Sequence, residues 1–491
     1  MLTAIGALVC EMLRLPRAAL AVSVGGLLAA AALALPLVGA HTTVFSGTFR
    51  VDDLSTWAAL TLLPATALST LLARAEIGGS DREGTVYSLL CFTALGALIL
   101  AGSGDVMLLV LGVLLSSLGS FALVAYGRDD PATEAAMKFF VFGSVSGAVM
   151  IFGLTYWFGV TGSTLFVRLG ALEHAPLAAA VGLVALIVGL GYKASLVPFH
   201  FWAPDAYDGA PVSVAAFLSV VPKIGAIFAL AQVVRDLPVS SNWPLVIAAL
   251  SVLTMTYGNL AALVQQNVVR LLAYSSIAQS GYFLLGVVAM GGHPLAQRAL
   301  VVFAVAYVAM NIGAFAVVLR TGRTLDDFTG LGRRRVVTGV AMVVFLLSLV
   351  GIPPLGGFVG KFLLFGAAMS SGFLWLAVAA ILNSVLSLAV YLRIVVPMYR
   401  QSGGPTTPAP KPLVTVVWAI ALLVTLGIAP AAQGLIARVG QAVADGGQQA
   451  GSQASGSRSE VNGSPTSAGG RVGGGSPGEA GFSGIQVRRP L

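Results

Sequence analysis

The chain has 491 residues, of which 57% are hydrophobic and only 9% are charged, and its mean hydropathy is +0.92. Soluble globular chains carry about 25% charged residues, so the polar side chains here are too few to cover a water-soluble particle of this size. The composition excludes a soluble enzyme, a nucleic-acid-binding protein and a secreted disulfide scaffold. It predicts an all-α polytopic membrane protein, despite the net charge of +8.

Apolar runs long enough to cross a bilayer, which takes about 20 residues, follow one another along most of the chain. A shorter apolar stretch at 1–13 precedes them and counts as a first segment, so the sequence predicts about 14 transmembrane helices, or 13 if this stretch does not span. The longer runs are 17–40, 53–73, 86–103, 105–127, 136–160, 177–200, 209–234, 243–265, 269–291, 296–319, 336–368, 372–398 and 412–432.

Lys and Arg residues divide unevenly between the two sets of alternate loops. Cytoplasmic loops carry the excess of basic residues, so the richer set is predicted to be cytoplasmic, in a multi-pass protein of the plasma membrane with both termini outside. The poorer set carries only Arg50, Arg168, Arg235 and Arg298. The richer set carries Arg14, Arg17, Arg74, Arg82, Arg128, Lys138, Arg270, Arg320, Arg323, Arg333, Arg334, Arg335, Arg393, Arg400 and Lys411.

The run at 336–368 is too long for one straight span. As a continuous helix it would measure about 50 Å, against a hydrocarbon core of about 30 Å. Its middle holds Pro353 and Pro354, which remove amide donors and clash with the preceding turn. We therefore expect this helix to break, and non-helical backbone at that depth requires surrounding protein or water.

Three of the five lysines, Lys193, Lys223 and Lys361, lie well inside apolar runs. A lysine at the centre of a span costs about 2.5–3.5 kcal/mol, which predicts a shared polar interior rather than contact with lipid. Buried lysines exchange protons readily, so we interpret the three as a proton or cation path. The alternative is that they extend to the membrane surface along their apolar stems.

Other polar residues accompany these lysines. His200, Asp205 and Asp208 lie in the Pro-rich stretch 197–211, which reads as a loop between two spans and could be a solvated connector. Polar side chains also crowd the border of the runs 243–265 and 269–291, where they could simply hydrogen-bond neighbouring helices. We assign His200 to the path itself, and the supporting polar residues are Asp205, Asp208, Gln265, Arg270 and Gln279.

The seventh and twelfth segments resemble one another, because each pairs a lysine with a nearby proline. Lys193 precedes Pro198, and Lys361 follows Pro354. Because the two segments are five apart in order, they run in opposite directions, which fits inverted five-helix repeats with broken helices at the site. The predicted units are 1–85 (N-terminal helices), 86–235 and 243–400 (the two repeats), 412–436 (last helix) and 437–491 (a Gly/Ser-rich tail expected to be disordered).

The two cysteines, Cys10 and Cys91, lie in or near apolar segments. Two cysteines cannot ligate an iron–sulfur cluster or build a zinc site. We therefore expect no metal and no redox cofactor in this chain.

Several motifs resemble subunit N of NADH-quinone oxidoreductase, a subunit family of respiratory complex I. The stretch Pro204-Asp205-Ala206-Tyr207-Asp208-Gly209-Ala210-Pro211 favours this subunit over its paralogues L, M and MrpD. The resemblance extends over about residues 50–432. The motifs that carry it are 134–140, 191–211, 258–278 and 348–362.

The resemblance implies a 14-helix antiporter-like membrane-arm subunit with inverted repeats and broken helices 7 and 12. It places the family's three membrane lysines on Lys193, Lys223 and Lys361. Such a subunit would take part in proton translocation coupled to electron transfer from NADH to quinone, which other subunits of the complex handle. Its expected partners are complex I membrane subunits resembling M, K and J, within the lipid bilayer and without nucleic acid.

The chain departs from the family pattern at two positions. The glutamate expected on helix 5 is replaced by Leu114, and many members have His where this chain has Gln279. Without the carboxylate, Lys193 lacks its charge partner and should favour the neutral form, whereas Leu114→Glu should restore an ion pair. Two alternatives therefore stay open: a Mrp-type cation/proton antiporter subunit, and a structural paralogue that assembles without pumping.

Overall fold

The structure is a computed structural model that describes residues 1–291, 295–400, 411–431 and 434. Within these residues the only paired strands are a short hairpin of β1 (Thr42–Val44) and β2 (Phe49–Val51), and nearly everything else is helical. The predicted tail at 437–491 lies outside the described residues. The helices up to the first break are α1 (Leu2–Met12), α2 (Pro16–Ala34), α3 (Asp53–Ile77), α4 (Glu83–Ala101), α5 (Val106–Val124), α6 (Asp130–Thr161) and α7 (Pro176–Ala194).

The remaining helices continue the same pattern of long apolar segments joined by short links. They are α8 (Trp202–Gly209), α9 (Val212–Val234), α10 (Trp243–Ala262), α11 (Val268–Val288), α12 (Leu295–Thr321), α13 (Leu331–Arg334), α14 (Val336–Val350), α15 (Gly356–Ser370), α16 (Leu374–Tyr399) and a last helix, Pro412–Ala431. Short 3-10 turns separate some of them, the longest being η3 (Phe166–His174).

Twelve of the described helices are long and apolar enough to cross a membrane. Every long run expected from the sequence has a counterpart among them except 336–368, which is divided between α14 and α15. The stretch at 1–13 forms α1, whose 11 residues are fewer than one crossing needs. The predicted fold class, a polytopic helical membrane protein, is confirmed.

The seventh span ends earlier than the sequence suggests. Helix α7 stops at Ala194 because Ser195 adopts a left-handed conformation with φ of 58°, three residues ahead of Pro198. The expectation of a loop over 197–211 is wrong, because residues Trp202–Gly209 form α8. Trp202 Nε1 donates to the carbonyl of Tyr192 at 2.8 Å, which holds α8 against the end of α7. The buried indole supplies the packing that a solvated loop would lack.

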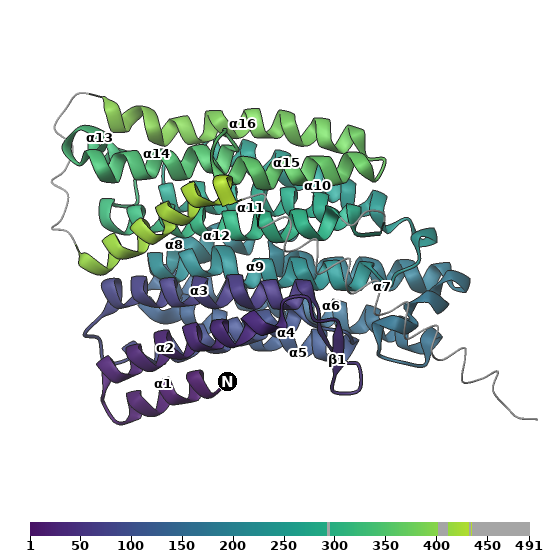
Figure 1. The fold of residues 1–491 in the computed structure, drawn as a ribbon. Helices are drawn as coiled ribbons and strands as arrows, with labels where there is room; N and C mark the ends of the chain where they lie inside the picture. The colour runs from purple at the N-terminus through teal and green to yellow at the C-terminus, as the bar shows by residue number, and fades with distance from the viewer. Residues whose placement is uncertain (292–294, 401–410, 432–433, 435–491) are drawn as a thin grey trace, which may run out of the picture. The chain divides into compact units, whose positions relative to one another are not determined.

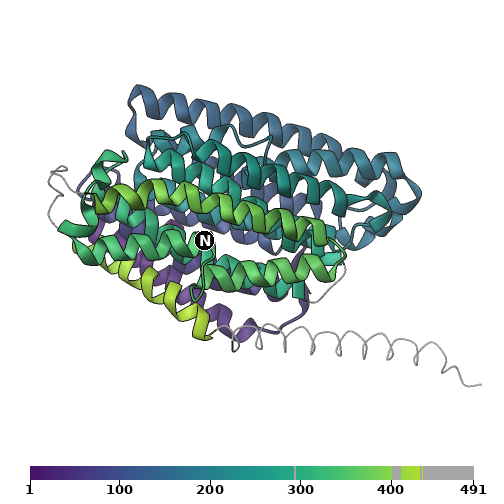
Figure 2. The ribbon, with the colours of Figure 1, turned by 90° about the horizontal axis from the view of Figure 1, so that it is seen from above.

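The predicted break in the run 336–368 is confirmed. Helix α14 ends at Gly351, whose φ of 94° suits glycine, and α15 begins at Gly356 beyond the proline pair. A Cβ on Gly357 would lie 1.8 Å from the carbonyl oxygen of Ser348, so the two halves approach closely only because residue 357 is glycine. Figures 1 and 2 show α14 and α15 running along one line beside α16, with the break between them.

Helix α9 is enclosed by other helices along its whole length, whereas α6 is mostly exposed at the edge of the bundle. Helix α9 packs against α3, α4, α7, α11 and α12. Its first turn is capped by Glu76 of α3, whose carboxylate accepts from the amides of Val212 and Ser213 and from the Ser213 hydroxyl. This packing places Lys223, in the middle of α9, at the centre of the helix bundle.

Ion pairs at the two ends of the helices follow the division of basic residues expected from the loops. At one end Arg74 pairs with Glu83, and at the other Arg235 pairs with Asp52. Arg74 belongs to the richer loop set and Arg235 to the poorer one. We call the first of these the arginine-rich end; which side of the membrane it faces stays a prediction.

Candidate functional site

Lys193 lies in the last turn of α7 and is 1% exposed. Its Nζ donates to Ser117 Oγ of α5 at 3.1 Å and lies 5.9 Å from the ring centroid of Phe139 on α6. The ammonium is therefore enclosed between three helices, with one hydroxyl as its hydrogen-bond partner.

The break after α7 carries further buried polar groups. His200 is 3% exposed, and its ring lies 4.6 Å from that of Tyr257 on α10. Neither His200 Nδ1 nor Ser195 Oγ has a hydrogen-bond partner within the described structure. Buried polar atoms in proteins are nearly always satisfied, commonly by ordered water, so this break is suited to hold water between helices.

Lys223, in the middle of α9, is also 1% exposed. Its Nζ donates to Ser276 Oγ of α11 at 2.7 Å and lies 5.5 Å from the ring centroid of Tyr207 on α8. The Tyr207 hydroxyl is buried and has no partner among the described residues. The short helix α8 thus brings a second polar group to the central lysine.

Lys361 lies on α15, just after the second break, and is 2% exposed. Its Nζ donates to the carbonyls of Leu349 at 2.9 Å and Val350 at 3.0 Å, and to Ser384 Oγ of α16 at 3.1 Å. The break leaves the last carbonyls of α14 without intrahelical donors, and a cation is favoured at such a helix end. The broken helix therefore builds the binding site of this ammonium.

One face of α11 connects the surroundings of Lys223 and Lys361. Ser275, Gln279 and Tyr282 follow one another at helical spacing on this face, beside the Ser276 that binds Lys223. Gln279 Nε2 donates to the carbonyl of Leu349, which Lys361 also uses, and the Tyr282 ring centroid lies 3.9 Å from Lys361 Nζ. We call these side chains, together with the three lysines and His200, the polar axis.

Within the described residues no carboxylate forms an ion pair with any of the three lysines of the polar axis. Their ammonium groups contact hydroxyls, carbonyls and aromatic faces instead. Hydroxyls and carbonyls accept hydrogen bonds from a charged ammonium without neutralising it. These surroundings therefore allow the three lysines to change their protonation state, whereas a permanent ion pair would hold them charged.

The structure places Leu114 differently from the expectation that it occupies the position facing Lys193. The Leu114 side chain is 47% exposed on the outer face of α5, and the residue that binds Lys193 is Ser117, almost one turn further along. The side chain of a glutamate at 114 would therefore project from the outer face of α5, whereas Ser117 lies on the enclosed face next to Lys193.

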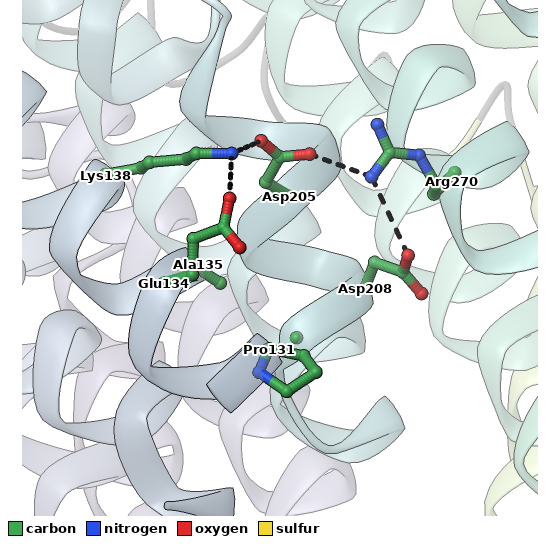
Figure 3. A pocket seen from close by; sticks show the side chains of 8 residues that line it. Pro131, Glu134, Ala135, Lys138, Asp205, Asp208 and Arg270 are labelled. Carbon is green, nitrogen blue, oxygen red and sulfur yellow. Dashed lines mark hydrogen bonds and ion pairs between the residues drawn. The ribbon is translucent and has the colours of Figure 1, made fainter. Parts of the chain in front are cut away.

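Asp205 and Asp208 lie on α8 in a charged cluster at the arginine-rich end (Figure 3). Asp205 accepts from Lys138 at 2.9 Å and from Arg270 at 2.8 Å, and Arg270 lies 3.6 Å from Asp208. Glu134 pairs with Lys138 at 2.7 Å. The cluster borders a cavity of about 430 Å³, so α8 carries charged residues at its surface and Tyr207 toward Lys223.

The remaining predicted site residues fall into two groups. Pro198, Pro353 and Pro354 lie in the non-helical links that separate α7 from α8 and α14 from α15. Gln265 lies in the link between α10 and α11, where its Nε2 donates to the carbonyl of Ala261, and it forms no hydrogen bond with the three lysines in the part of the chain that the structure describes. The structure therefore brings Gln279 into the polar axis but not Gln265.

Sequence reasoning missed the hydroxyl partners of the lysines. Ser117, Ser276 and Ser384 each accept from one lysine, yet a serine in an apolar helix is common and carries little signal by itself. The spacing of Ser275, Gln279 and Tyr282 on α11 was the available clue, because these positions share one helix face. Among the described residues there is no cluster of three His, Cys, Asp or Glu side chains suited to a metal ion.

Comparison with known proteins gives consistent matches over most of the chain. A family profile described as NADH:quinone oxidoreductase/Mrp antiporter, TM, matches residues 103–387. NADH-quinone oxidoreductase subunit N of Desulfovibrio desulfuricans is 41% identical over 418 residues, which cover 79% of this chain and 82% of that protein.

Solved structures give the same picture. A chain of respiratory complex I from Thermus thermophilus with bound aureothin is similar with a TM-score of 0.79 and 32% identity, covering 89% of this chain and 97% of that one. A chain of the Mrp complex from Dietzia sp. is similar with a TM-score of 0.78 and 22% identity, covering 90% of this chain and 95% of that one, and it shares the fold.

Proposed function

Because the chain belongs to the NADH-quinone oxidoreductase subunit N family, we propose that it takes part in proton translocation in the membrane arm of a complex I-type oxidoreductase. In this proposal Lys193, Lys223 and Lys361 carry protons in turn along the polar axis. Electron transfer from NADH to quinone takes place on other subunits and drives the movement.

The observation that carries the proposal is the burial of all three lysines beside polar groups, with one face of α11 joining the surroundings of Lys223 and Lys361. Each lysine is at most 2% exposed, and α11 supplies Ser276 beside Lys223 and Tyr282 beside Lys361. Burying three lysines in apolar helices costs several kcal/mol in total. A structural role alone would not require three lysines here, since apolar residues would fill the same positions at no such cost.

The chemistry follows from the groups that surround each lysine. A neutral lysine accepts a proton from a hydroxyl or water on one side and, as an ammonium, donates a proton on the other. Hydroxyl groups can take part because they both donate and accept hydrogen bonds. The ring of Tyr207 lies beside Lys223 and that of Tyr282 beside Lys361, and both hydroxyls are buried without a hydrogen-bond partner among the described residues. Water bound to these hydroxyls would complete the relay between the lysines.

The proposed setting is the plasma membrane, with both termini outside, in a complex with membrane subunits resembling M, K and J. Family membership supports a multi-subunit membrane complex of this kind. NADH and quinone would bind to the other subunits.

The proposal is tested with the intact complex in sealed vesicles by measuring protons moved per NADH oxidised with a pH-sensitive dye. Lys223→Met should lower this ratio, because the central proton carrier is lost. Lys411→Met is the matched control, since Lys411 is exposed and, among the described residues, its ammonium donates to the carbonyl of Ala75. An unchanged ratio in Lys223→Met would contradict the proposal.

The same vesicles distinguish the two alternatives. A Mrp-type antiporter subunit would exchange protons for a cation in the absence of NADH, and a sodium gradient alone would then drive proton movement. A non-pumping structural paralogue would give the same ratio for all lysine variants, provided that the complex still assembles.

A further inference from the structure

A second cavity lies at the arginine-rich end, between the start of α4 and the end of α5. It measures about 480 Å³, and its charged lining residues are Arg82 and Arg128. Thr85 and Tyr126 add hydroxyl groups, and Tyr126 donates its own hydroxyl to Ser80. The cavity is separate from the cluster around Asp205, with which it shares no lining residue.

Neither guanidinium of this cavity is engaged by another described residue. Three carboxylates are next to them in sequence, and none of the three lines the cavity: Asp81, Glu83 and Asp129. Glu83 binds Arg74, the amide of Gly79 and the Tyr87 hydroxyl. Asp129 caps α6 by accepting from the amide of Ala132. The cavity is therefore lined by two positive charges and by no carboxylate.

The inner wall of the cavity is apolar. Val86 and Leu89 on α4 and Ala122 on α5 line it, and Leu89 lies about 10 Å along the helix axis from Arg82. On α5, Leu118 lies one helical turn before Ala122 and is 63% exposed. The cavity thus has a cationic mouth at the end of two spans and an apolar surface that leads into the bilayer.

We propose that this cavity binds the phosphate headgroup of an anionic phospholipid. Arginine binds phosphate oxygens through paired hydrogen bonds, and basic pockets between transmembrane helices are suited to anionic headgroups. The apolar wall gives the acyl chains a path along α4 and α5, which a free phosphate ion would not use. The assignment is independent of proton transport and concerns a different surface of the chain.

The test uses the purified full chain, stripped of lipid in detergent, and native mass spectrometry with added phosphatidylglycerol. The double variant Arg82→Gln/Arg128→Gln should bind this lipid about thirtyfold more weakly, from about 1 kcal/mol for each arginine. Arg17→Gln is the matched control, because Arg17 is exposed at the start of α2 and does not line the cavity. Phosphatidylcholine binding should be the same in all forms.

A second variant separates charge from folding. Arg82→Lys/Arg128→Lys keeps both charges and should retain most of the affinity, and circular dichroism checks that every variant is helical. Equal phosphatidylglycerol binding in parent and double Gln variant would overturn the proposal. So would displacement of the lipid by millimolar inorganic phosphate, which would show a simple anion site. In the assembled complex, a photocrosslinker at Leu89 should capture lipid, and capture of a neighbouring subunit instead would also overturn it.

Discussion

The three buried lysines are accommodated in different ways. Lys361 has three acceptors for its three donors, because the carbonyls of Leu349 and Val350 and the hydroxyl of Ser384 surround it. Among the described residues, Lys193 donates only to the hydroxyl of Ser117, and Lys223 only to that of Ser276. An ammonium with one partner is poorly compensated for its lost hydration. These two lysines are therefore the positions where an added carboxylate should have the greatest effect.

The contact between Lys193 and Ser117 predicts the outcome of Ser117→Asp. The new carboxylate would replace the hydroxyl at 3.1 Å from Nζ and form an enclosed ion pair, so the variant should fold and assemble. In a Lys193→Ala background the same aspartate would be buried and unpaired, at a cost of about 3–5 kcal/mol. Thermal unfolding of the two single variants and the double variant measures this coupling.

Leu114→Glu provides the comparison for that cycle. Because the Leu114 side chain is 47% exposed, we expect its coupling to Lys193 to be weaker than that of Ser117→Asp. Stronger coupling from position 114 would mean that α5 is rotated relative to α7 in the assembled protein. If Ser117→Asp changed the unfolding temperature equally with and without Lys193, the contact between residues 117 and 193 would be refuted.

The close approach at Gly357 gives a second test at the scale of a residue. In Gly357→Ala the new methyl group would collide with the Ser348 carbonyl, so the halves of the broken helix would have to separate, at roughly 1–3 kcal/mol. Gly147→Ala is the control, since a Cβ there meets no atom within 4 Å. A lower unfolding temperature is expected for Gly357→Ala only; equal midpoints would count against the close packing of α14 on α15.

At the scale of the helices, the two breaks determine where the lysines find their partners. The first ends α7 just after Lys193 and creates α8, which brings Tyr207 to Lys223. The second exposes the carbonyls that bind Lys361. Each break therefore contributes polar groups that a continuous helix would use internally.

Replacing both prolines of the second break tests this argument. In Pro353→Ala/Pro354→Ala, α14 and α15 can grow toward one another, and the carbonyls of Leu349 and Val350 can return to intrahelical hydrogen bonds. The complex should still assemble, while proton movement per NADH oxidised should drop because Lys361 loses its acceptors. Pro412→Ala, at the start of the last helix, serves as control. Unchanged transport would show that the break is not required for proton movement.

At the scale of the whole molecule, the ends of the helices differ in charge. The arginine-rich end includes the cluster of Lys138, Asp205 and Arg270 and the cavity of Arg82 and Arg128. The hairpin of β1 and β2 lies at the other end, where Arg50 pairs with Asp236. This asymmetry predicts orientation, since basic residues are retained in the cytoplasm.

Reporter insertions test the orientation directly. A reporter at Arg334 should be active in the cytoplasm, and one in the turn between β1 and β2, at Gly47, should be active outside. The same reporter fused after residue 491 should lie outside if both termini do. The predicted orientation would be contradicted if the reporter at Gly47 were cytoplasmic. It would also be contradicted if the reporters at Arg334 and Gly47 were active on the same side of the membrane.

The sequence by itself determined the spans, the break at Pro353 and Pro354, the buried lysines and the family, since each depends on local composition, proline chemistry or a contiguous motif. Only the tertiary structure decided which side chains meet. Ser117 rather than Leu114 faces Lys193, and α8 forms where a loop was expected. Both outcomes depend on the rotation of one helix against others from distant parts of the chain, and in a uniformly apolar helix the sequence carries little information about that rotation.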